Sequence, residues 1–449
     1  MTATLAAMRF GYGLPLPDGA GQDAQGVLAA LDTGDEMAVR WPLLGMAKVQ
    51  LDLANVRRLR PGSRVDEAVR AQYLAALADL EAKVRLGERH SFARALDAPD
   101  GFRERLVQFW SDHFTVVARE VPTRIMTYTI VEDAIRPYLA SSFEQMFVAA
   151  ELHPAMLLYL DQINSVGPNT NLGKRRGRGL NENLAREMIE LHSLGAGAGY
   201  SQQDVRQLAE LLTGITYSPI DGLHYDKNRA EPGPEQILGR EYTGESLDTI
   251  RLALRDLARH PETRAHICRK IAVHFISDTP QPDLLAQMEA AWGDAGGDLR
   301  AVYAAMLSHS TAWDPVAHKV RQPFEFLVAA LRALGVDGAG VVAMSARDFQ
   351  KLILDQMLLM GQRMKRPIGP DGWPEEQEAW ITPQGLASRI TWAMEVPGRL
   401  VNPLPDPGAL AMRVLGDRLT DVVRKAATRA ESQREGVGMV LASAEFNRR

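Results

Sequence analysis

The sequence is poor in cysteine, and Cys268 is the single example among its 449 residues. One thiol cannot form an intramolecular disulfide, and its isolation excludes every metal or redox motif that needs several cysteines. Cys268 lies in an amphipathic helical run, A-H-I-C-R-K-I-A-V, and is therefore expected to pack in the core. Cysteine chemistry gives no lead on function.

Long hydrophobic runs are also missing, because no apolar stretch approaches the roughly 18 residues that a membrane span requires. The N-terminus, M-T-A-T-L-A-A-M-R-F-G-Y-G, has no basic start, no sustained apolar core and no clear cleavage site for export. We expect a cytoplasmic chain without a transmembrane segment. A chain from which an export signal had been removed would look the same.

Neither sign of charge dominates the sequence. The formal net charge is −5, so the protein has no overall field that would attract nucleic acid or an anionic membrane. A local basic run, K-R-R-G-R at 174–178, has no aromatic residue between its charges and is expected to be a solvated loop. No nucleic-acid partner is expected.

The residues that are present favour helix. The composition, with 46% hydrophobic, 24% charged and 6% aromatic residues, is that of an ordinary globular protein. Apolar residues recur at spacings of three and four, as in helices, in the ranges 65–86, 102–117, 123–139, 247–259, 262–276, 299–308 and 409–427. Alternating, strand-like runs are short and lie near 214–219 and 236–242. The predicted fold class is all-α: a compact multi-helix array with long irregular loops and at most a small β-hairpin.

The predicted domain organisation is one helical domain over residues 1–449. Its parts are an N-terminal helical part (about 1–160), a signature region (about 161–246) and a C-terminal helical part (about 247–449). Two irregular stretches, about 161–180 and 218–246, exceed the usual connection length, and such loops tend to be functional or mobile. Both flank the most polar motif of the chain.

That motif is N-E-N-L-A-R-E-M-I-E-L-H-S-L-G-A-G-A-G-Y at 181–200. Asn181 is expected to cap a helix over about 182–194, and Gly195 is well placed to end it. Ser201 and Asp204 then resemble a capping box that opens a second helix. The motif predicts helix, glycine loop, helix.

The helical spacing fixes where the polar side chains of the first helix point. At about 100° per residue, Glu187 and Glu190 lie on one polar stripe, whereas His192 lies in the apolar arc. His192 and Glu190 therefore cannot bind one ion from the same helix. The two glutamates either share an ion with ligands from other segments or pair with Arg186 and neighbouring arginines.

Candidate partners lie elsewhere in the chain. His113, in R-E-R-L-V-Q-F-W-S-D-H-F-T, is expected to face the core among aromatic side chains, where a buried imidazole must be hydrogen-bonded or ligated. His224 and Asp226, in L-H-Y-D, are expected on a loop that presents a ligand or a general base. The predicted catalytic residues are Glu187, Glu190, His192 and Asp226. The predicted ligands of a divalent metal ion are His113, Glu187 and His224.

The motif residues also carry a family resemblance. The stretches 181–195 and 199–214 closely resemble the signature of the bacterial domain-of-unknown-function family 1800. Supporting stretches are 9–13, 103–114, 319–327 and 369–389. The resemblance implies a helical fold across the chain and no established activity. Members are often exported, which makes a periplasmic or secreted location the alternative to the cytoplasm.

The resemblance also implies a partner, because members are often encoded beside another uncharacterised bacterial family. The sequence departs from the family after T-G at 213–214, where a compact H-D-x-x-x-K-x-x-L-G is common. Here an acidic, proline-containing insert separates His224 and Asp226 from Leu238-Gly239, and the lysine has no equivalent. The roles of His224 and Asp226 depend on this region.

Two hypotheses for the function follow. The first is a hydrolase-like, metal-assisted enzyme with its site around the N-E-N-L-A-R-E-M-I-E-L-H helix. The second is a non-catalytic binding or assembly protein that acts with the co-encoded partner and uses the same polar residues as a buried network. Trp373 and Trp380 are expected to pin a turn-rich segment onto the helical body, with a ligand-stacking surface as the alternative. Substrate and oligomeric state are not predicted.

Overall fold

The structure is a computed structural model that describes residues 3–14, 23–118, 120–176 and 179–449. Most of these residues are helical and only two small sheets occur among them, which confirms the predicted all-α class. The run 174–178, expected as a loop, is helical at 174–176, where helix α11 (Asn171–Arg176) ends; Gly177 and Arg178 lie outside the described residues. No helix of the described chain combines the length and apolar character that crossing a membrane needs.

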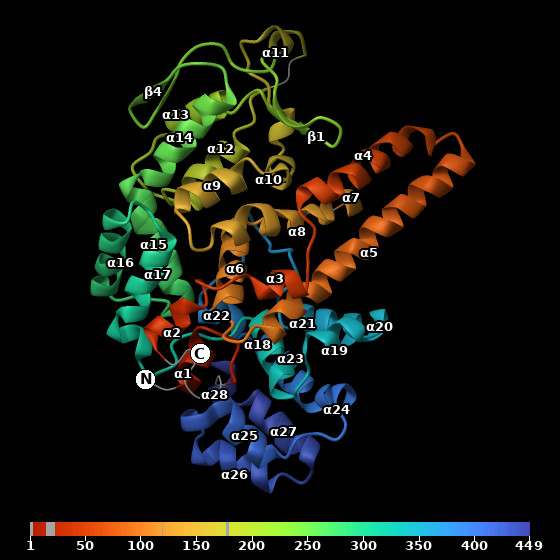
Figure 1. The fold of residues 1–449 in the computed structure, drawn as a ribbon, viewed down its shortest axis with the longest axis vertical. Helices are drawn as coiled ribbons and strands as arrows, with labels where there is room; N and C mark the ends of the chain where they lie inside the picture. The colour runs from red at the N-terminus through yellow and green to blue at the C-terminus, as the bar shows by residue number, and fades with distance from the viewer. Residues whose placement is uncertain (1–2, 15–22, 119, 177–178) are drawn as a thin grey trace.

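The first third of the chain builds a long helical arm and the centre of the molecule (Figure 1). Its helices are α1 (Ala3–Arg9), α2 (Ala24–Ala29), α3 (Glu36–Arg40), α4 (Met46–Gly62), α5 (Glu67–Asp97), α6 (Phe102–His113), α7 (Val121–Arg124), α8 (Met126–Ile130), α9 (Phe143–Glu151) and α10 (Pro154–Tyr159). Short π- and 3-10 turns follow α8 and α10: η1 (Val131–Ile135), η2 (Arg136–Tyr138) and η3 (Gln162–Asn164). Asp66 caps the start of helix α5: its carboxylate accepts the N–H groups of Ala68 and Val69.

The signature region differs in part from its prediction. After α11 (Asn171–Arg176), helix α12 covers only Asn183–Glu187 and continues as a π-helix, η4 (Met188–His192). The expected α-helix to residue 194 is therefore wrong beyond Glu187, because a change to i→i+5 hydrogen bonds cannot be read from apolar spacing. Asn181 contributes at the start all the same, since its side chain accepts the N–H of Asn183.

The turn and the second helix of the motif follow the prediction. Gly195 has φ +96°, a conformation that favours glycine. Ser201 and Asp204 form the predicted capping box at the start of α13 (Gln202–Leu211).

Two antiparallel hairpins follow, where one at most was expected. β1 (Ile215–Ser218) pairs with β2 (Gly222–Tyr225), and β3 (Glu235–Ile237) pairs with β4 (Arg240–Tyr242). His224 thus lies in strand β2 and not on a loop, which corrects its predicted setting.

The rest of the chain is helical. It comprises α14 (Leu247–Arg259), α15 (Pro261–Phe275), α16 (Pro282–Asp294), α17 (Leu299–Ser308), η5 (Ser310–Trp313), α18 (Pro323–Ala333), α19 (Gly338–Ala343), α20 (Ala346–Phe349), η6 (Gln350–Leu354), α21 (Asp355–Leu359), α22 (Gln377–Trp380), α23 (Pro383–Glu395), α24 (Pro397–Leu400), α25 (Pro407–Leu415), η7 (Gly416–Arg418), α26 (Asp421–Arg429), α27 (Gln433–Ala442) and α28 (Ala444–Asn447).

The core consists of two hydrophobic clusters. One joins most helices up to η5, and the other joins the C-terminal helices from α18 onward. Helix α5 contributes to both, through Leu80 and Val84 on one side and Phe92 and Leu96 on the other. The single domain with three parts stays a prediction.

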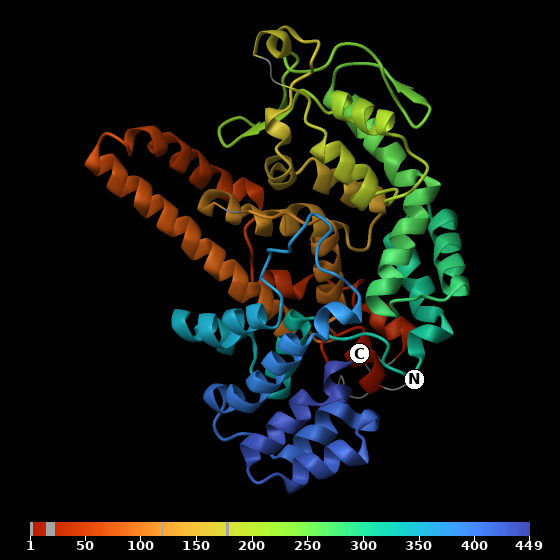
Figure 2. The ribbon, with the colours of Figure 1, turned by 180° about the vertical axis from the view of Figure 1, so that it is seen from behind.

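A long irregular segment between α21 and α22 positions the site. In Figure 2 this light-blue segment leaves the C-terminal helices and rises toward α6 and α8. Trp380, just after it, is buried and donates its indole N–H to the carbonyl of Pro374. The rings of Trp373 and Trp380 lie 5.9 Å apart, so the tryptophan pair helps to hold the segment in place.

Candidate functional site

The polar stripe of the signature helix is partly engaged in ion pairs. Glu190 lies 3.3 Å from the guanidinium of Arg186, which also contacts Glu182 at 3.0 Å. These side chains are about one-third exposed, and such exposed pairs contribute little to stability. For Glu190 the structure therefore shows the arginine pairing that was one of the two expectations.

His192 belongs to a buried carboxylate–imidazole pair. Its Nδ1 lies 2.7 Å from Oε1 of Glu151, at the end of α9, and both side chains are buried. Nε2 of His192 and Oε2 of Glu151 have no hydrogen-bond partner in the described chain. Sequence reasoning missed Glu151, whose only signal was a carboxylate at the end of the apolar helix F-E-Q-M-F-V-A-A-E.

His113 joins this pair from helix α6. Its Nε2 lies 3.3 Å from the carbonyl oxygen of His192, and the two imidazole centroids are 5.8 Å apart. The ring stacks on Phe109 and packs edge-on against Phe114, as the sequence predicted. Burial lowers the pKa of His113 well below its usual value, so the imidazole is neutral at physiological pH.

Glu187 remains a half-buried carboxyl group for which no ion pair is seen in the described chain. Burial raises its pKa, nearby His192 lowers it, and Glu190 and Asp371 raise it further. Asp371 belongs to the segment between α21 and α22. The signature helix therefore faces that segment with a carboxyl group whose pKa is raised.

His224 and Asp226 form local contacts in the hairpin region. Nδ1 of His224 lies 3.1 Å from the carbonyl oxygen of Gly222, and the Asp226 side chain accepts the N–H of Asn228 at 3.0 Å. Across the described residues, no three His, Cys, Asp or Glu side chains form a group that could hold a metal ion. His113, Glu187 and His224 are thus not assembled as the predicted ligand set, and the roles of Glu187, Glu190, His192 and Asp226 stay predictions.

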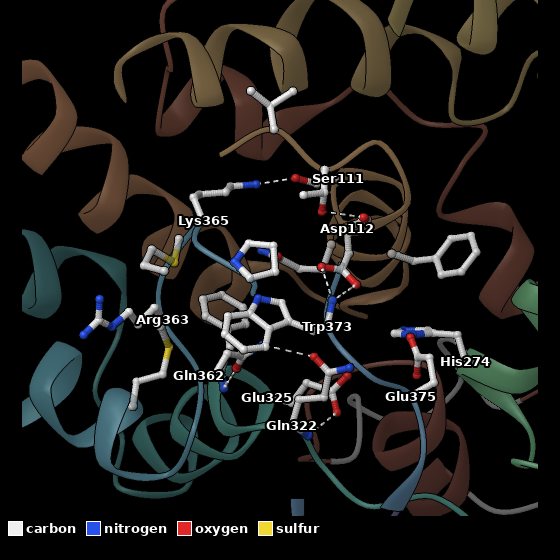
Figure 3. A pocket seen from close by; sticks show the side chains of 18 residues that line it. Ser111, Asp112, His274, Gln322, Glu325, Gln362, Arg363, Lys365, Trp373 and Glu375 are labelled. Atoms are coloured by element: carbon white, nitrogen blue, oxygen red, sulfur yellow. Dashed lines mark hydrogen bonds and ion pairs between the residues drawn. The ribbon is translucent and has the colours of Figure 1, made fainter. Parts of the chain in front are cut away.

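A cavity lies on the other side of helix α6 (Figure 3). Its volume is about 60 Å³, which exceeds the roughly 10–15 Å³ that one water needs. Its walls come from α6, the start of α18 and the segment 362–375. It therefore lies where the two hydrophobic clusters meet.

Asp112, which directly precedes His113 in the chain, lines this cavity. Its carboxylate accepts the backbone N–H of Trp373 through both oxygens, at 2.9 and 3.1 Å. The chain comes this close because Gly372 has φ +84° and no side chain, and a Cβ there would lie 2.6 Å from Oδ2 of Asp112. Burial raises the pKa of Asp112 to about 7; Glu375 raises it as well, whereas Lys270 and Lys365 lower it.

Ser111 and Lys365 meet at the top of the cavity in Figure 3. The Lys365 ammonium nitrogen is hydrogen-bonded to Oγ of Ser111. Burial lowers the pKa of Lys365 to about 8, although Asp112 opposes the shift. Lys365 also has φ +52°, a conformation that non-glycine residues rarely adopt and that clusters at functional sites. A lysine with a pKa of about 8 carries a neutral fraction near physiological pH.

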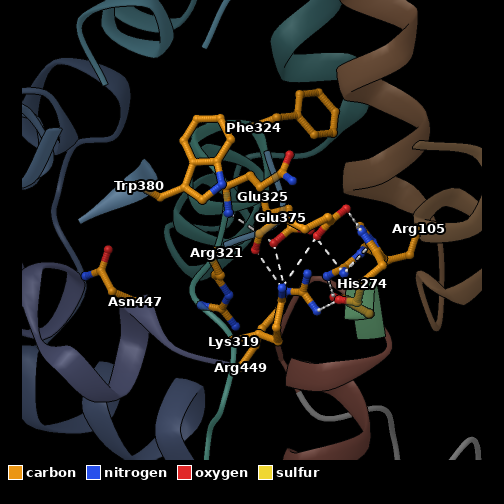
Figure 4. Close-up of polar contacts among 12 residues, drawn as sticks. Arg105, His274, Lys319, Arg321, Phe324, Glu325, Glu375, Trp380, Asn447 and Arg449 are labelled. Carbon is orange, nitrogen blue, oxygen red and sulfur yellow. Dashed lines mark hydrogen bonds and ion pairs between the residues drawn. The ribbon is translucent and has the colours of Figure 1, made fainter. Parts of the chain in front are cut away.

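The floor of the cavity is a buried ion network (Figure 4). Glu325 contacts Arg105 at 3.0 Å and Arg449 at 2.9 Å. His274 lies between Glu375, at 2.6 Å, and Arg105, at 3.0 Å. These contacts tie α6, α15 and α18 to the segment before α22, and they hold the cavity walls in register.

Sequence reasoning also missed Ser111 and Lys365. Ser111 lies in the F-W-S-D-H-F helix, whose spacing and aromatic residues point to His113 and carry no signal for the serine. The available signal for Lys365 was R-M-K-R at 363–366, a basic run within a turn-rich segment. The two residues are 254 positions apart, so their contact has no local signature.

Comparison with known proteins gives one finding. The model of a protein family of unknown function, DUF1800, matches residues 7–448, nearly the whole chain. No curated protein and no solved structure matches the chain. The fold and the motif residues thus agree with the family match, and the chain belongs to the DUF1800 family of proteins of unknown function.

Proposed function

We propose that this protein is a hydrolase in which Ser111 is the nucleophile and Lys365 its general base. The observation that carries the proposal is the hydrogen bond between Oγ of Ser111 and the half-buried Lys365 amine, at a cavity. Serine–lysine pairs are a known variant of the activated serine nucleophile. A desolvated lysine suits the role of base because its pKa is lowered toward the working pH.

The reaction balances without a cofactor. Oγ of Ser111 bonds to the substrate carbonyl carbon while its proton moves to the neutral Nζ of Lys365. The tetrahedral intermediate then collapses and the bond to the leaving group breaks. The leaving group takes a proton from Asp112, and Asp112 recovers one from Lys365, whose Nζ is then neutral again. Water attacks the acyl-serine next and gives a proton to Nζ of Lys365; as the carboxylic acid leaves, Lys365 returns this proton to Oγ and regenerates Ser111.

Asp112 supplies the second proton-transfer group in this proposal. With a pKa of about 7, its carboxyl group is partly protonated near neutral pH and can donate to a leaving group. Glu187 of the signature helix faces the same segment with a raised pKa, and we assign it a positioning role. In this proposal the catalytic residues line the cavity, whereas the sequence analysis placed them on the signature helix.

A fluorophosphonate probe tests the proposal without a known substrate. We expect one covalent adduct per chain, located at Ser111 by peptide mass spectrometry and absent in Ser111→Ala. Lys365→Arg should retain the charge but abolish labelling at neutral pH, because a guanidinium does not deprotonate in proteins. Ser308→Ala is the matched control, since its hydroxyl donates to the Ala305 carbonyl, accepts from the Gln287 amide and has no lysine beside it among the contacts described. A folded wild-type protein that never forms the Ser111 adduct contradicts the nucleophilic role.

One observation favours a second function. His192 contacts Glu151 through its side chain and His113 through its backbone carbonyl. These contacts join α6, α9 and the signature helix, as a purely structural network would. On this view the protein is a non-catalytic binding or assembly protein that acts with the co-encoded partner. Co-purification of that partner by the wild-type chain, together with an unreactive Ser111, would favour this second function over the first.

A further inference from the structure

The cavity that holds Ser111 and Lys365 adjoins a larger cleft. The two share Val116, Arg363, Pro367 and Trp373 in their linings. The cleft has a volume of about 790 Å³, within the roughly 300–1,000 Å³ typical of small-molecule sites. A ligand in the cleft would therefore lie beside the cavity of the serine–lysine pair, with Trp373 lining both spaces.

Most of the residues that line the cleft are apolar, although polar atoms form a large part of its exposed surface. Met126 of α8, Leu158 of α10 and Leu358 of α21 line it from three helices. Ile368 also lines the cleft, although its side chain is 98% exposed to solvent. An apolar ligand would cover this side chain and remove it from water.

The charged groups of the lining favour an anion. Arg363 and Arg366 both line the cleft, together with the single carboxylate Glu120. In the part of the chain that the structure describes, neither guanidinium forms an ion pair with a carboxylate. By contrast, Arg124 nearby is paired with Glu81 at 2.9 Å. Guanidinium groups bind carboxylates and phosphates through parallel hydrogen bonds, so Arg363 and Arg366 suit an anionic ligand group.

Building on the proposed hydrolase, we infer that its substrate is an amphipathic anion: an ester or amide whose apolar chain lies in the cleft and whose carboxylate or phosphate contacts Arg363 and Arg366. The scissile carbonyl lies at Ser111. Because Lys365 lies between the two arginines in sequence, one short segment both recognises the anion and supplies the base. Binding of the anion would then place the reacting bond.

Titration calorimetry with ten-carbon probes below their micelle concentrations tests the inference. We expect decanoate and decyl phosphate to bind one per chain, and decyltrimethylammonium to bind at least ten times more weakly. The ratio of the two anions distinguishes carboxylate from phosphate recognition. Val117→Trp, which fills the cleft from its lining, should abolish binding of all three probes.

The arginine variants make the test specific. Arg363→Gln/Arg366→Gln should weaken both anions at least tenfold and reduce the salt dependence of binding. Arg424→Gln/Arg429→Gln, on the exposed face of α26, is the matched control and should change nothing. Equal binding of anion and cation, or a cleft-arginine variant that binds like wild type, overturns the inference.

The result is separable from the hydrolase proposal. Ser111 labelling without anion binding would contradict the proposed substrate class and support Ser111 as the nucleophile. Anion binding without labelling would contradict Ser111 as the nucleophile and support a cleft that only binds anions.

Discussion

Nδ1 of His192 lies 2.7 Å from Oε1 of Glu151, and less than 2% of either side chain is exposed. This pair connects the π-helical end of the signature helix to the end of α9. Because the second nitrogen of the imidazole and the second oxygen of the carboxylate have no partner among the described residues, the pair is self-contained. The main effect of the pair is therefore to stabilise the contact between the signature helix and α9.

Removing Glu151 should destabilise the protein strongly. Glu151→Ala leaves the buried His192 without its acceptor, and breaking one partner of a buried pair costs roughly 3–5 kcal/mol. We expect a loss of that order in the free energy of unfolding, measured by chemical denaturation. Glu190→Gln is the control and should cost less than about 1 kcal/mol, because the Arg186 pair is partly exposed. Equal effects of the two variants would contradict the buried role of Glu151.

Asp112 should make stability depend on pH. Its pKa is raised by burial from 3.8 to about 7 in the folded protein, so the folded state binds the proton more tightly than the unfolded state. The stabilisation this gives is complete below pH 3.8 and is lost as pH rises through 7. Relative to wild type, Asp112→Asn should become more stable by more than about 1 kcal/mol between pH 5 and 8. Parallel stability curves for the two proteins would show that Asp112 does not titrate in this range.

Labelling of Ser111 should increase with pH. Lys365 accepts a proton only when neutral, and its pKa is about 8, so the rate should rise and level off above this value. The measurement is the rate of fluorophosphonate adduct formation between pH 6 and 10. A rate that is flat over that interval, with a folded protein, would remove Lys365 as the base.

Gly372 should tolerate no side chain. Gly372→Ala adds a Cβ that would lie 2.6 Å from the Asp112 carboxylate, at φ +84°. Gly361→Ala is a close match, because φ is +102° there and no atom lies within 4 Å. Both variants are strained by about 1 kcal/mol or more, but only Gly372→Ala should also displace Asp112 and slow Ser111 labelling. Equal labelling rates for the two variants would show that the conformation at Gly372 does not affect the reactivity of Ser111.

The metal-assisted version of the enzyme is tested by metal analysis of protein purified without chelators. Since His113, Glu187 and His224 do not form a ligand group in the described chain, we expect Glu187→Ala and His224→Ala to leave the metal content unchanged. A stoichiometric ion that both variants lose would restore the predicted ligand set.

The sequence predicts the fold far better than the site. Apolar spacing identifies the helices, and Ser201 with Asp204 marks a helix start, because both signals arise from neighbouring residues. The π-helix at Met188–His192 escapes such reasoning, since its spacing is set by packing and not by local preference. Glu151 and Lys365 escape it because each contacts a residue far away in the chain, and no local sequence pattern indicates these contacts.

Helix α5 has a mechanical consequence. Its 31 residues form one continuous rod whose middle is embedded in one apolar core and whose C-terminal end is embedded in the other. Neither half of the molecule can melt without releasing part of this rod, so the protein should denature in one cooperative step. The cavity between the two hydrophobic clusters should then be lost at the same temperature at which the helices unfold.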